Sequence, residues 1–360
     1  MKPIYKQAVS AFLALMFVGT MSAQYIQKNL IANRHGYQEG RLDPNLVNGW
    51  GLAYLPGSPF WVADNLTGVS TLYTGQGAIV PLVVTIPHAA SLIFGPVGSP
   101  AGLVANPTTD FVISKGGKSG PALFIFSTND GSISGWNPNV DPTNAIIMVD
   151  NSLKTPPAIY TGLAIGVNSK GKNVLYAADA GPNNRIDMIN GTWTSIGNFT
   201  DSTGYVPAGL SAYAAQNVNG KLYVTFASET PFQGGAVDVF DFDGNLVTHF
   251  AENSPAGPLE APWGIALAPA DFDKFSNALL IGNVDDGRIN AFDPATHAFL
   301  GQLATPAGKP IEIGGLWGLA FGGGTAANGQ TNQLFFSAGP NGYADGLFGL
   351  IHATGEGGGK

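Results

Sequence analysis

The stretch Trp317-Gly318-Leu319-Ala320 recurs in varied form along the whole chain of 360 residues. Each copy has a residue that is usually apolar or aromatic, then glycine, then leucine or isoleucine, and usually alanine. The six copies are Trp50-Gly51-Leu52-Ala53, Ala101-Gly102-Leu103-Val104, Thr161-Gly162-Leu163-Ala164, Ala208-Gly209-Leu210-Ser211, Trp263-Gly264-Ile265-Ala266 and Trp317-Gly318-Leu319-Ala320. Because they follow one another at intervals of roughly 50 residues, they indicate a fold built from one repeated unit.

Two further segments with the alternation of β-strands follow each copy. The second strand of each unit is predicted at Phe60–Asp64, Leu123–Ser127, Leu175–Asp179, Leu222–Ser228, Leu279–Asn283 and Leu334–Ser337. The third strand is predicted at Val69–Tyr73, Ile133–Trp136, Arg185–Ile189, Val237–Phe240, Arg288–Phe292 and Leu347–Ile351. Hairpin turns that contain glycine, such as Asp130-Gly131, separate the two.

These repeats predict an all-β protein, a single-domain six-bladed β-propeller whose blades begin near residues 48, 99, 159, 206, 261 and 315. Each repeated glycine is expected near the central channel, where converging backbones leave no room for a side chain. A strand from one terminus must close the ring, and Tyr25–Ile31 is expected to pair outside the last blade.

Composition excludes several classes of protein. Only 11% of the residues are charged, against roughly a quarter in ordinary domains, and the net charge is −8. No cluster of lysine and arginine is present that could follow a phosphate backbone, so nucleic acid is not an expected partner. The chain has no cysteine and therefore no disulfide, and it must be held together by packing.

Residues 1–23 have the pattern of a signal peptide that is removed on export. Lys2 and Lys6 precede an apolar run from Ala8 to Val18, and small residues follow up to Ala23. That run is too short to span a bilayer, so no membrane span is expected after cleavage. We therefore expect a secreted or periplasmic, monomeric protein, with the propeller at residues 24–354 and a flexible tail at 355–360.

Several motifs carry a family resemblance. The segment Phe60–Asn65 resembles the NHL and SMP-30/gluconolactonase-like group of propellers. Closer similarity lies in Asn48–Ala53, Ala261–Pro269, Leu279–Asp293 and Gly315–Gly322, which resemble a family of uncharacterised exported six-bladed propellers. Many members of that family carry a PEP-CTERM sorting tail, which this sequence lacks, so anchoring by that route is not expected. The resemblance implies the fold but no reaction.

Three tryptophans are the most suggestive candidates for ligand binding. Trp50, Trp263 and Trp317 occupy the same repeat position in the first, fifth and sixth blades, which ring closure makes contiguous. Flat aromatic surface at the channel mouth would suit a carbohydrate or another small amphipathic ligand. The alternative is that each tryptophan is a wedge packed between neighbouring blades.

Polar residues at the ends of the second strands form the other candidate set. They are Asp64, Asn65, Asp179, Glu229, Asn283 and Asp285. Equivalent positions of all blades share one end of the ring, so these side chains could converge there; the ligand-binding prediction joins Asp64, Asn65, Asp179 and Asn283 to the tryptophans. Alternatively, each polar residue caps the backbone of its own turn.

The sequence therefore favours a binding or interaction module for an unidentified small molecule, glycan or protein, without a cofactor. The alternative is a metal-dependent hydrolase or lyase of the gluconolactonase-like type, since the resemblance to that group implies a divalent cation held by oxygen ligands in the channel. Glu260, Asn283, Asp64 and Asp179 would then hold Ca²⁺ or Mg²⁺ or act as bases. A third possibility is a purely structural envelope component. An oxygen-lined channel favours the enzyme, whereas an apolar or glycine-lined channel favours binding.

Overall fold

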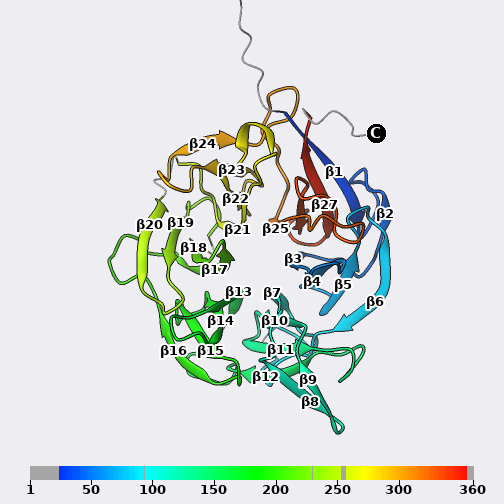
Figure 1. The fold of residues 1–360 in the computed structure, drawn as a ribbon, viewed down its shortest axis with the longest axis vertical. Helices are drawn as coiled ribbons and strands as arrows, with labels where there is room; N and C mark the ends of the chain where they lie inside the picture. The colour runs from blue at the N-terminus through cyan, green and yellow to red at the C-terminus, as the bar shows by residue number, and fades with distance from the viewer. Residues whose placement is uncertain (1–23, 93, 229, 253–256, 355–360) are drawn as a thin grey trace, which may run out of the picture.

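The structure, a computed structural model, describes residues 24–92, 94–228, 230–252 and 257–354. Six sheets stand in a ring around a central axis, so the predicted all-β six-bladed propeller is confirmed (Figure 1). Within those residues the only helical element is the 3-10 turn η1 (Asp273–Phe275), and no helix is long and apolar enough to span a membrane. The predicted signal peptide at 1–23, the tail at 355–360 and Glu229 lie outside the described residues.

Each blade is a four-stranded antiparallel sheet with its first strand at the channel. Blades one to three comprise β3 (Gly49–Ala53), β4 (Phe60–Asp64), β5 (Val69–Tyr73) and β6 (Ile79–Thr85); β7 (Pro100–Ala105), β10 (Phe124–Thr128), β11 (Ser132–Trp136) and β12 (Ile146–Asp150); and β13 (Tyr160–Val167), β14 (Asn173–Asp179), β15 (Arg185–Asn190) and β16 (Ser195–Phe199). Blades four to six comprise β17 (Ser211–Val218), β18 (Lys221–Ala227), β19 (Ala236–Phe240) and β20 (Leu246–Glu252); β21 (Pro262–Leu267), β22 (Leu279–Asn283), β23 (Ile289–Phe292) and β24 (Phe299–Gln302); and β25 (Leu316–Phe321), β26 (Leu334–Ala338), β27 (Leu347–Ala353) and β1 (Tyr25–Ala32). The short strand β2 (Arg41–Leu42) extends the last sheet, and β8 (Val112–Lys115) and β9 (Lys118–Pro121) form a separate hairpin.

The N-terminal strand closes the ring, as the sequence predicts. Strand β1 pairs antiparallel with β27, from Tyr25 opposite Ala353 to Ala32 opposite Leu347 (Figure 1). Tyr25 is fully buried, and its hydroxyl donates a hydrogen bond to the carbonyl of Phe272 at 3.0 Å. The first strand of the chain is therefore fastened both to the last blade and to the loop of the fifth.

Glycines let the inner strands approach one another. A Cβ added to Gly264 would lie 2.3 Å from the carbonyl oxygen of Trp317 on the neighbouring inner strand. At Gly51 it would lie 2.6 Å from the carbonyl oxygen of Ala101. Both distances are shorter than any normal contact, so these positions require glycine for the reason predicted.

The sequence pattern predicts the wrong position for the inner strand of the fourth blade. The predicted copy, Ala208-Gly209-Leu210-Ser211, lies almost wholly before β17, and Gly209 is exposed with a φ of +92° and open space around it. The inner position of this blade belongs to Ala214, whose Cα lies 2.6 Å from where a Cβ on Gly162 would be. Gly209 thus serves a loop with left-handed backbone and not the channel, and the predicted explanation for all six glycines is wrong at this blade.

Candidate functional site in the central channel

The three candidate tryptophans meet at the centre of the ring. Trp50 and Trp317 are stacked with ring centroids 3.7 Å apart, and Trp263 stands edge-on to both, at 6.3 and 6.0 Å. All three are buried, with exposed fractions of 8%, 1% and 3% in the order Trp50, Trp317 and Trp263. Trp50 and Trp317 cover one face of each other, whereas Trp263 meets both in an edge contact. The three rings therefore pack against one another at the axis, and they form neither an open aromatic platform nor separate wedges.

Hydrogen bonds fix two of the three tryptophans, Trp263 and Trp317, across the channel. The Trp263 indole N–H donates to the carbonyl of Thr161 at 3.0 Å, and the Trp317 indole N–H donates to Asn48 Oδ1 at 2.9 Å. Tyr213, the residue at the equivalent position of the fourth blade, packs against Trp50 and Trp317 at 6.5 and 6.1 Å. We call Trp50, Tyr213, Trp263 and Trp317 the tryptophan plug.

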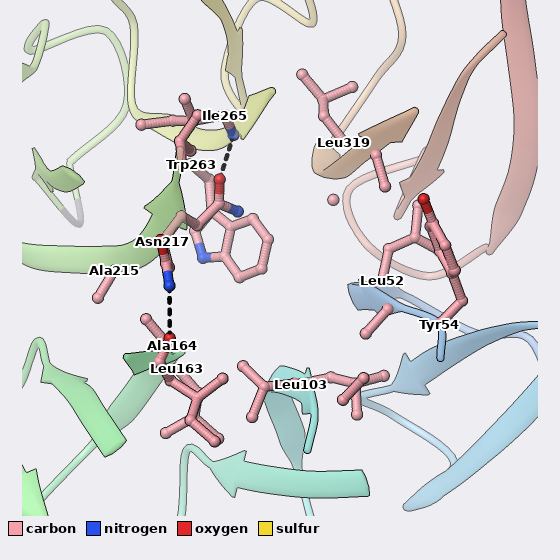
Figure 2. A pocket seen from close by; sticks show the side chains of 18 residues that line it. Leu52, Tyr54, Leu103, Leu163, Ala164, Ala215, Asn217, Trp263, Ile265 and Leu319 are labelled. Atoms are coloured by element: carbon pink, nitrogen blue, oxygen red, sulfur yellow. Dashed lines mark hydrogen bonds between the residues drawn. The ribbon is translucent and has the colours of Figure 1, made fainter. Parts of the chain in front are cut away.

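A cavity of about 350 Å³ lies on one side of the plug. The residues that follow the inner glycines line it, and Trp263 contributes to its wall. They are Leu52, Leu103, Leu163, Ile265 and Leu319, with Ala215 in the fourth blade. Figure 2 shows these side chains arranged around a central opening. We call these six residues the leucine ring; their apolar side chains line the cavity together with polar groups, among them Gln216 and Asn217.

Two amides of β17 supply polar groups at this cavity. Gln216 Oε1 accepts a hydrogen bond from the Ile265 N–H at 2.6 Å, and Asn217 Nδ2 donates to the Ile165 carbonyl at 2.9 Å (Figure 2). Each inner strand is the edge of its sheet, so these amides satisfy edge groups of the neighbouring blades. Gln216 is half-buried at the cavity wall, where its Nε2 can donate a hydrogen bond to a ligand.

The other side of the plug holds a smaller cavity of about 220 Å³, lined by Trp50, Tyr213 and Asn129 among others. A chain of amides runs beside it. Asn48 Nδ2 donates to Asn65 Oδ1 at 3.3 Å, and Asn65 Nδ2 donates to Asn129 Oδ1 at 2.7 Å. Asn65 therefore supports the plug through Asn48. Asn129 lies one residue beyond the strand β10. It was not among the residues predicted from the sequence, because the second blade has no Asp-Asn pair like that of the first.

Asp64 is buried between the first and last blades. Its side chain is fully inaccessible, and neither carboxylate oxygen has a hydrogen bond of normal geometry within the described chain. Burial raises the pKa of this carboxyl well above its ordinary value, and the nearby Thr71 hydroxyl offsets only part of that effect. Asp64 therefore has the environment of a neutral carboxylic acid in the core and does not face the channel cavity.

The remaining polar candidates bind loops at the ends of the blades, in some cases the loop of a neighbouring blade. Asp179 accepts from the Gly181 N–H of its own turn at 3.2 Å, as the capping interpretation expects. It also accepts from the Ile159 N–H at 2.9 Å and from Asn183 Nδ2 at 2.7 Å. Asn283 Nδ2 donates to the Pro258 carbonyl at 2.9 Å. The acids of the fifth blade bind the loop of the fourth, since Asp285 accepts from the Phe232 N–H at 2.7 Å and Glu260 from the Gly234 N–H at 3.1 Å.

The structure brings the tryptophans together and links Asn65 to them through Asn48. Among the described residues, Asp64, Asp179 and Glu260 form no group close enough to share one ion, and Asn283 Nδ2 donates to the Pro258 carbonyl. In the described part of the chain, the one group of three histidine, aspartate or glutamate side chains close enough for a metal is Asp201, Asp238 and His249. These residues have no sequence motif in common and lie away from the channel, on the fourth blade and the loop before it.

The fold and the channel define this protein as a six-bladed β-propeller with an aromatic plug. No protein-family model matches the sequence. Two proteins of Acanthamoeba polyphaga mimivirus are each 29% identical to it over 89% of the chain: uncharacterized protein R648, of which 78% is covered, and uncharacterized protein L690, of which 84% is covered.

Solved structures confirm the architecture. Virginiamycin B lyase from Staphylococcus aureus is 13% identical, with a TM-score of 0.53 over 92% of this chain and 99% of that one. A glucose dehydrogenase is 12% identical, with a TM-score of 0.50 over 87% of this chain and 98% of that one. At such low identity these likenesses concern the fold, in which lyases and dehydrogenases both occur.

Proposed function

We propose that this propeller is a binding module that takes the apolar end of a small amphipathic molecule into the leucine ring. The observation that carries the proposal is the cavity of about 350 Å³, walled by the leucine ring and by Trp263 of the plug. Its volume falls within the range of about 300–1,000 Å³ typical of small-molecule sites. The cavity beyond the plug, at about 220 Å³, is smaller than that range.

The chemistry of the wall favours a ligand with one apolar and one polar end. Leucine and isoleucine side chains meeting around an opening gain about 25 cal/mol for each Å² of apolar ligand surface that they remove from water. Gln216 Nε2 can donate a hydrogen bond to an oxygen of the same ligand. Stacking of a sugar between Trp50 and Trp317 is not favoured, because these two rings are stacked on each other. A sugar would bind through an apolar substituent.

The alternative hydrolase or lyase would require several oxygen ligands around one ion at the channel. The described side chains that line the channel cavity are mostly aliphatic, with Trp263, Tyr54 and the amides of Gln216 and Asn217, and none is a carboxylate or a histidine. This geometry favours binding over metal-dependent catalysis at that place.

Three related probes test the proposal: hexyl β-glucoside, 1-hexanol and glucose. We expect hexyl β-glucoside and 1-hexanol to raise the Tm and to change the fluorescence of Trp263, because a ligand specific to the native state stabilises it. Glucose alone is expected to do neither. A response to glucose without a response to either alkyl probe, or no response at all, would overturn the proposal.

A matched pair of variants locates the response. Ala215 holds the position at which the other five blades carry leucine or isoleucine, so Ala215→Leu would extend a side chain into the cavity. We expect it to abolish binding of the alkyl probes. Ala298→Leu makes the same change at an exposed position on the outside of the fifth blade and should bind as the wild type does.

We also propose that the protein acts outside the cytoplasm, as an exported member of the propeller family that it resembles. The support is the sequence pattern of residues 1–23. N-terminal sequencing of the protein from fractionated cells tests this proposal. A secreted or periplasmic form beginning near Gln24 supports it, and a cytoplasmic form that begins with Met1 contradicts it.

A further inference from the structure

A second site lies on the outer side of the fourth blade. Asp238 stands on β19, His249 on the adjacent outer strand β20, and Asp201 on the loop that leaves the third blade after β16 (Figure 1). One potential ligand atom from each residue lies within 4.8 Å of the other two. His249 Nδ1 and Asp238 Oδ1 are 2.8 Å apart. The three side chains therefore converge from two blades on one point.

Asp238 is the central member of this group. Its side chain is fully buried, and its Oδ2 atom has no hydrogen-bond partner in the described chain. A buried carboxylate oxygen without a partner is costly, because it has lost water and gained nothing in exchange. A metal ion bound between Asp238, Asp201 and His249 would give this carboxylate oxygen a positively charged partner.

The charges around the site also favour a bound cation. Asp201 and Asp238 approach each other, yet within the described residues neither forms an ion pair with lysine or arginine. Two carboxylates this close repel unless a cation or a proton lies between them. The His249 side chain is 27% exposed and Asp201 is half-buried, so an ion can reach the site from solvent.

Surrounding contacts hold the ligands in place. Thr203 Oγ1 donates to Asp201 Oδ1 at 2.7 Å and lies 3.2 Å from His249 Nε2. The ring of Tyr205 stacks on the imidazole with centroids 3.8 Å apart. With its Nε2–H donating to Thr203, His249 could bind a metal through Nδ1, where the ion would replace the proton of the contact with Asp238 Oδ1. Outer contacts of this kind commonly orient histidine ligands.

We propose that Asp201, Asp238 and His249 bind one divalent first-row transition-metal ion, for which Zn²⁺ is the probe. Two carboxylates and one imidazole suit Zn²⁺ or Mn²⁺ better than Ca²⁺, which prefers oxygen ligands alone. Zinc binds such ligand atoms at about 2.0–2.2 Å. Three protein ligands leave one position of a tetrahedral ion for water.

Such an ion would fasten the connection between two blades. Asp201 belongs to the segment between β16 and β17, and the other two ligands belong to the third and fourth strands of the next blade. The same segment lines a small cavity of about 150 Å³ that includes Asp201, Val206 and Leu210. Binding at this site is independent of the channel, so its success or failure does not bear on the function proposed above.

Titration of Zn²⁺ into EDTA-treated protein by isothermal calorimetry tests the proposal. We expect one ion per chain and an increase in Tm on binding, with little response to Ca²⁺. Co²⁺ should give the visible absorption bands of a four-coordinate site. If wild-type protein binds neither Zn²⁺ nor Co²⁺ in a one-to-one ratio, the proposal is wrong.

Variants decide which residues hold the ion. Asp238→Asn, His249→Gln and Asp201→Asn are each expected to weaken Zn²⁺ binding by at least about tenfold. Asp201→Asn lies in an exposed loop and keeps the test valid if the buried Asp238→Asn fails to fold. His297→Gln, which removes a different imidazole, should bind as the wild type does. Unchanged binding in all three site variants would overturn the proposal.

Discussion

Trp50 and Trp317 lie face to face with ring centroids 3.7 Å apart and an interplanar angle of 20°. They stand on the first and last inner strands of the ring, so their contact joins the two ends of the propeller at its axis. The hydrogen bond from the Trp317 indole to Asn48 crosses the same junction. The repeat therefore closes the ring twice, by strand β1 at the outside and by the tryptophan plug at the centre.

Truncation of the plug should destabilise the fold. Trp317→Ala removes the buried ring that contacts Trp50, Trp263 and Tyr213, and we expect a loss of about 3–5 kcal/mol in the free energy of unfolding. Urea denaturation measures it. Trp317→Phe keeps part of the packing and should lose less. Equal stability of Trp317→Ala and the wild type would show that the plug is not part of the core.

Strand closure offers a second prediction about stability. Tyr25→Phe removes only the hydroxyl that donates to Phe272, and we expect a loss of about 1 kcal/mol. Tyr25→Ala also removes the ring packed against Phe272 and Phe275, and the expected loss is about 3–5 kcal/mol. Thermal or urea unfolding of the pair separates the two contributions. Similar losses for both variants would contradict the packing role of the ring.

The buried Asp64 predicts an unusual dependence of stability on pH. Its pKa is raised in the folded state, so folded protein holds this proton more tightly than unfolded protein does. Stability from this group is present at low pH and is lost as pH rises from the unfolded-state pKa toward the folded one, by up to about 1.4 kcal/mol per pH unit. Asp64→Asn should therefore be more stable than the wild type at pH 7, with the difference shrinking toward pH 4.

Asp345 is the matched control, with the opposite sign. Hydrogen bonds from Tyr37, Arg34 and Asn33 lower the pKa of this carboxyl despite its burial. Its contribution is present at neutral pH and is lost as pH falls through the lowered folded-state pKa. Asp345→Asn should therefore be less stable than the wild type at pH 7. If both variants change stability in the same direction at pH 7, the assigned environments are wrong.

The repeat made most of the fold predictable. The predicted strands Phe60–Asp64, Val69–Tyr73 and Leu279–Asn283 coincide with β4, β5 and β22, because alternation and turn residues mark both ends of each. The fourth blade was misplaced because a loop glycine, Gly209, imitates the repeat while alanine occupies the true position. Local pattern cannot distinguish the two, since the decisive contact is with Gly162 of another blade.

The site was predictable only in part. The repeat placed Trp50, Trp263 and Trp317 together, but it could not show that their faces would cover one another, which depends on side-chain directions across the channel. Five members of the leucine ring stand in the predicted motifs, but the motif could not show that they line a cavity; the sixth, Ala215, lies outside the predicted fourth copy. Asp201, Asp238 and His249 were missed because no short spacing links residues that only the docking of a loop onto the next blade brings together.

A crystal structure of the protein with hexyl β-glucoside tests the central claim most directly. We predict the hexyl chain between Leu52, Leu163 and Leu319, with the glucose ring toward solvent and a glucoside oxygen accepting from Gln216 Nε2. A ligand bound instead beside Trp50 on the other side of the plug, or only on the outer surface of the blades, would contradict a binding site in the leucine ring.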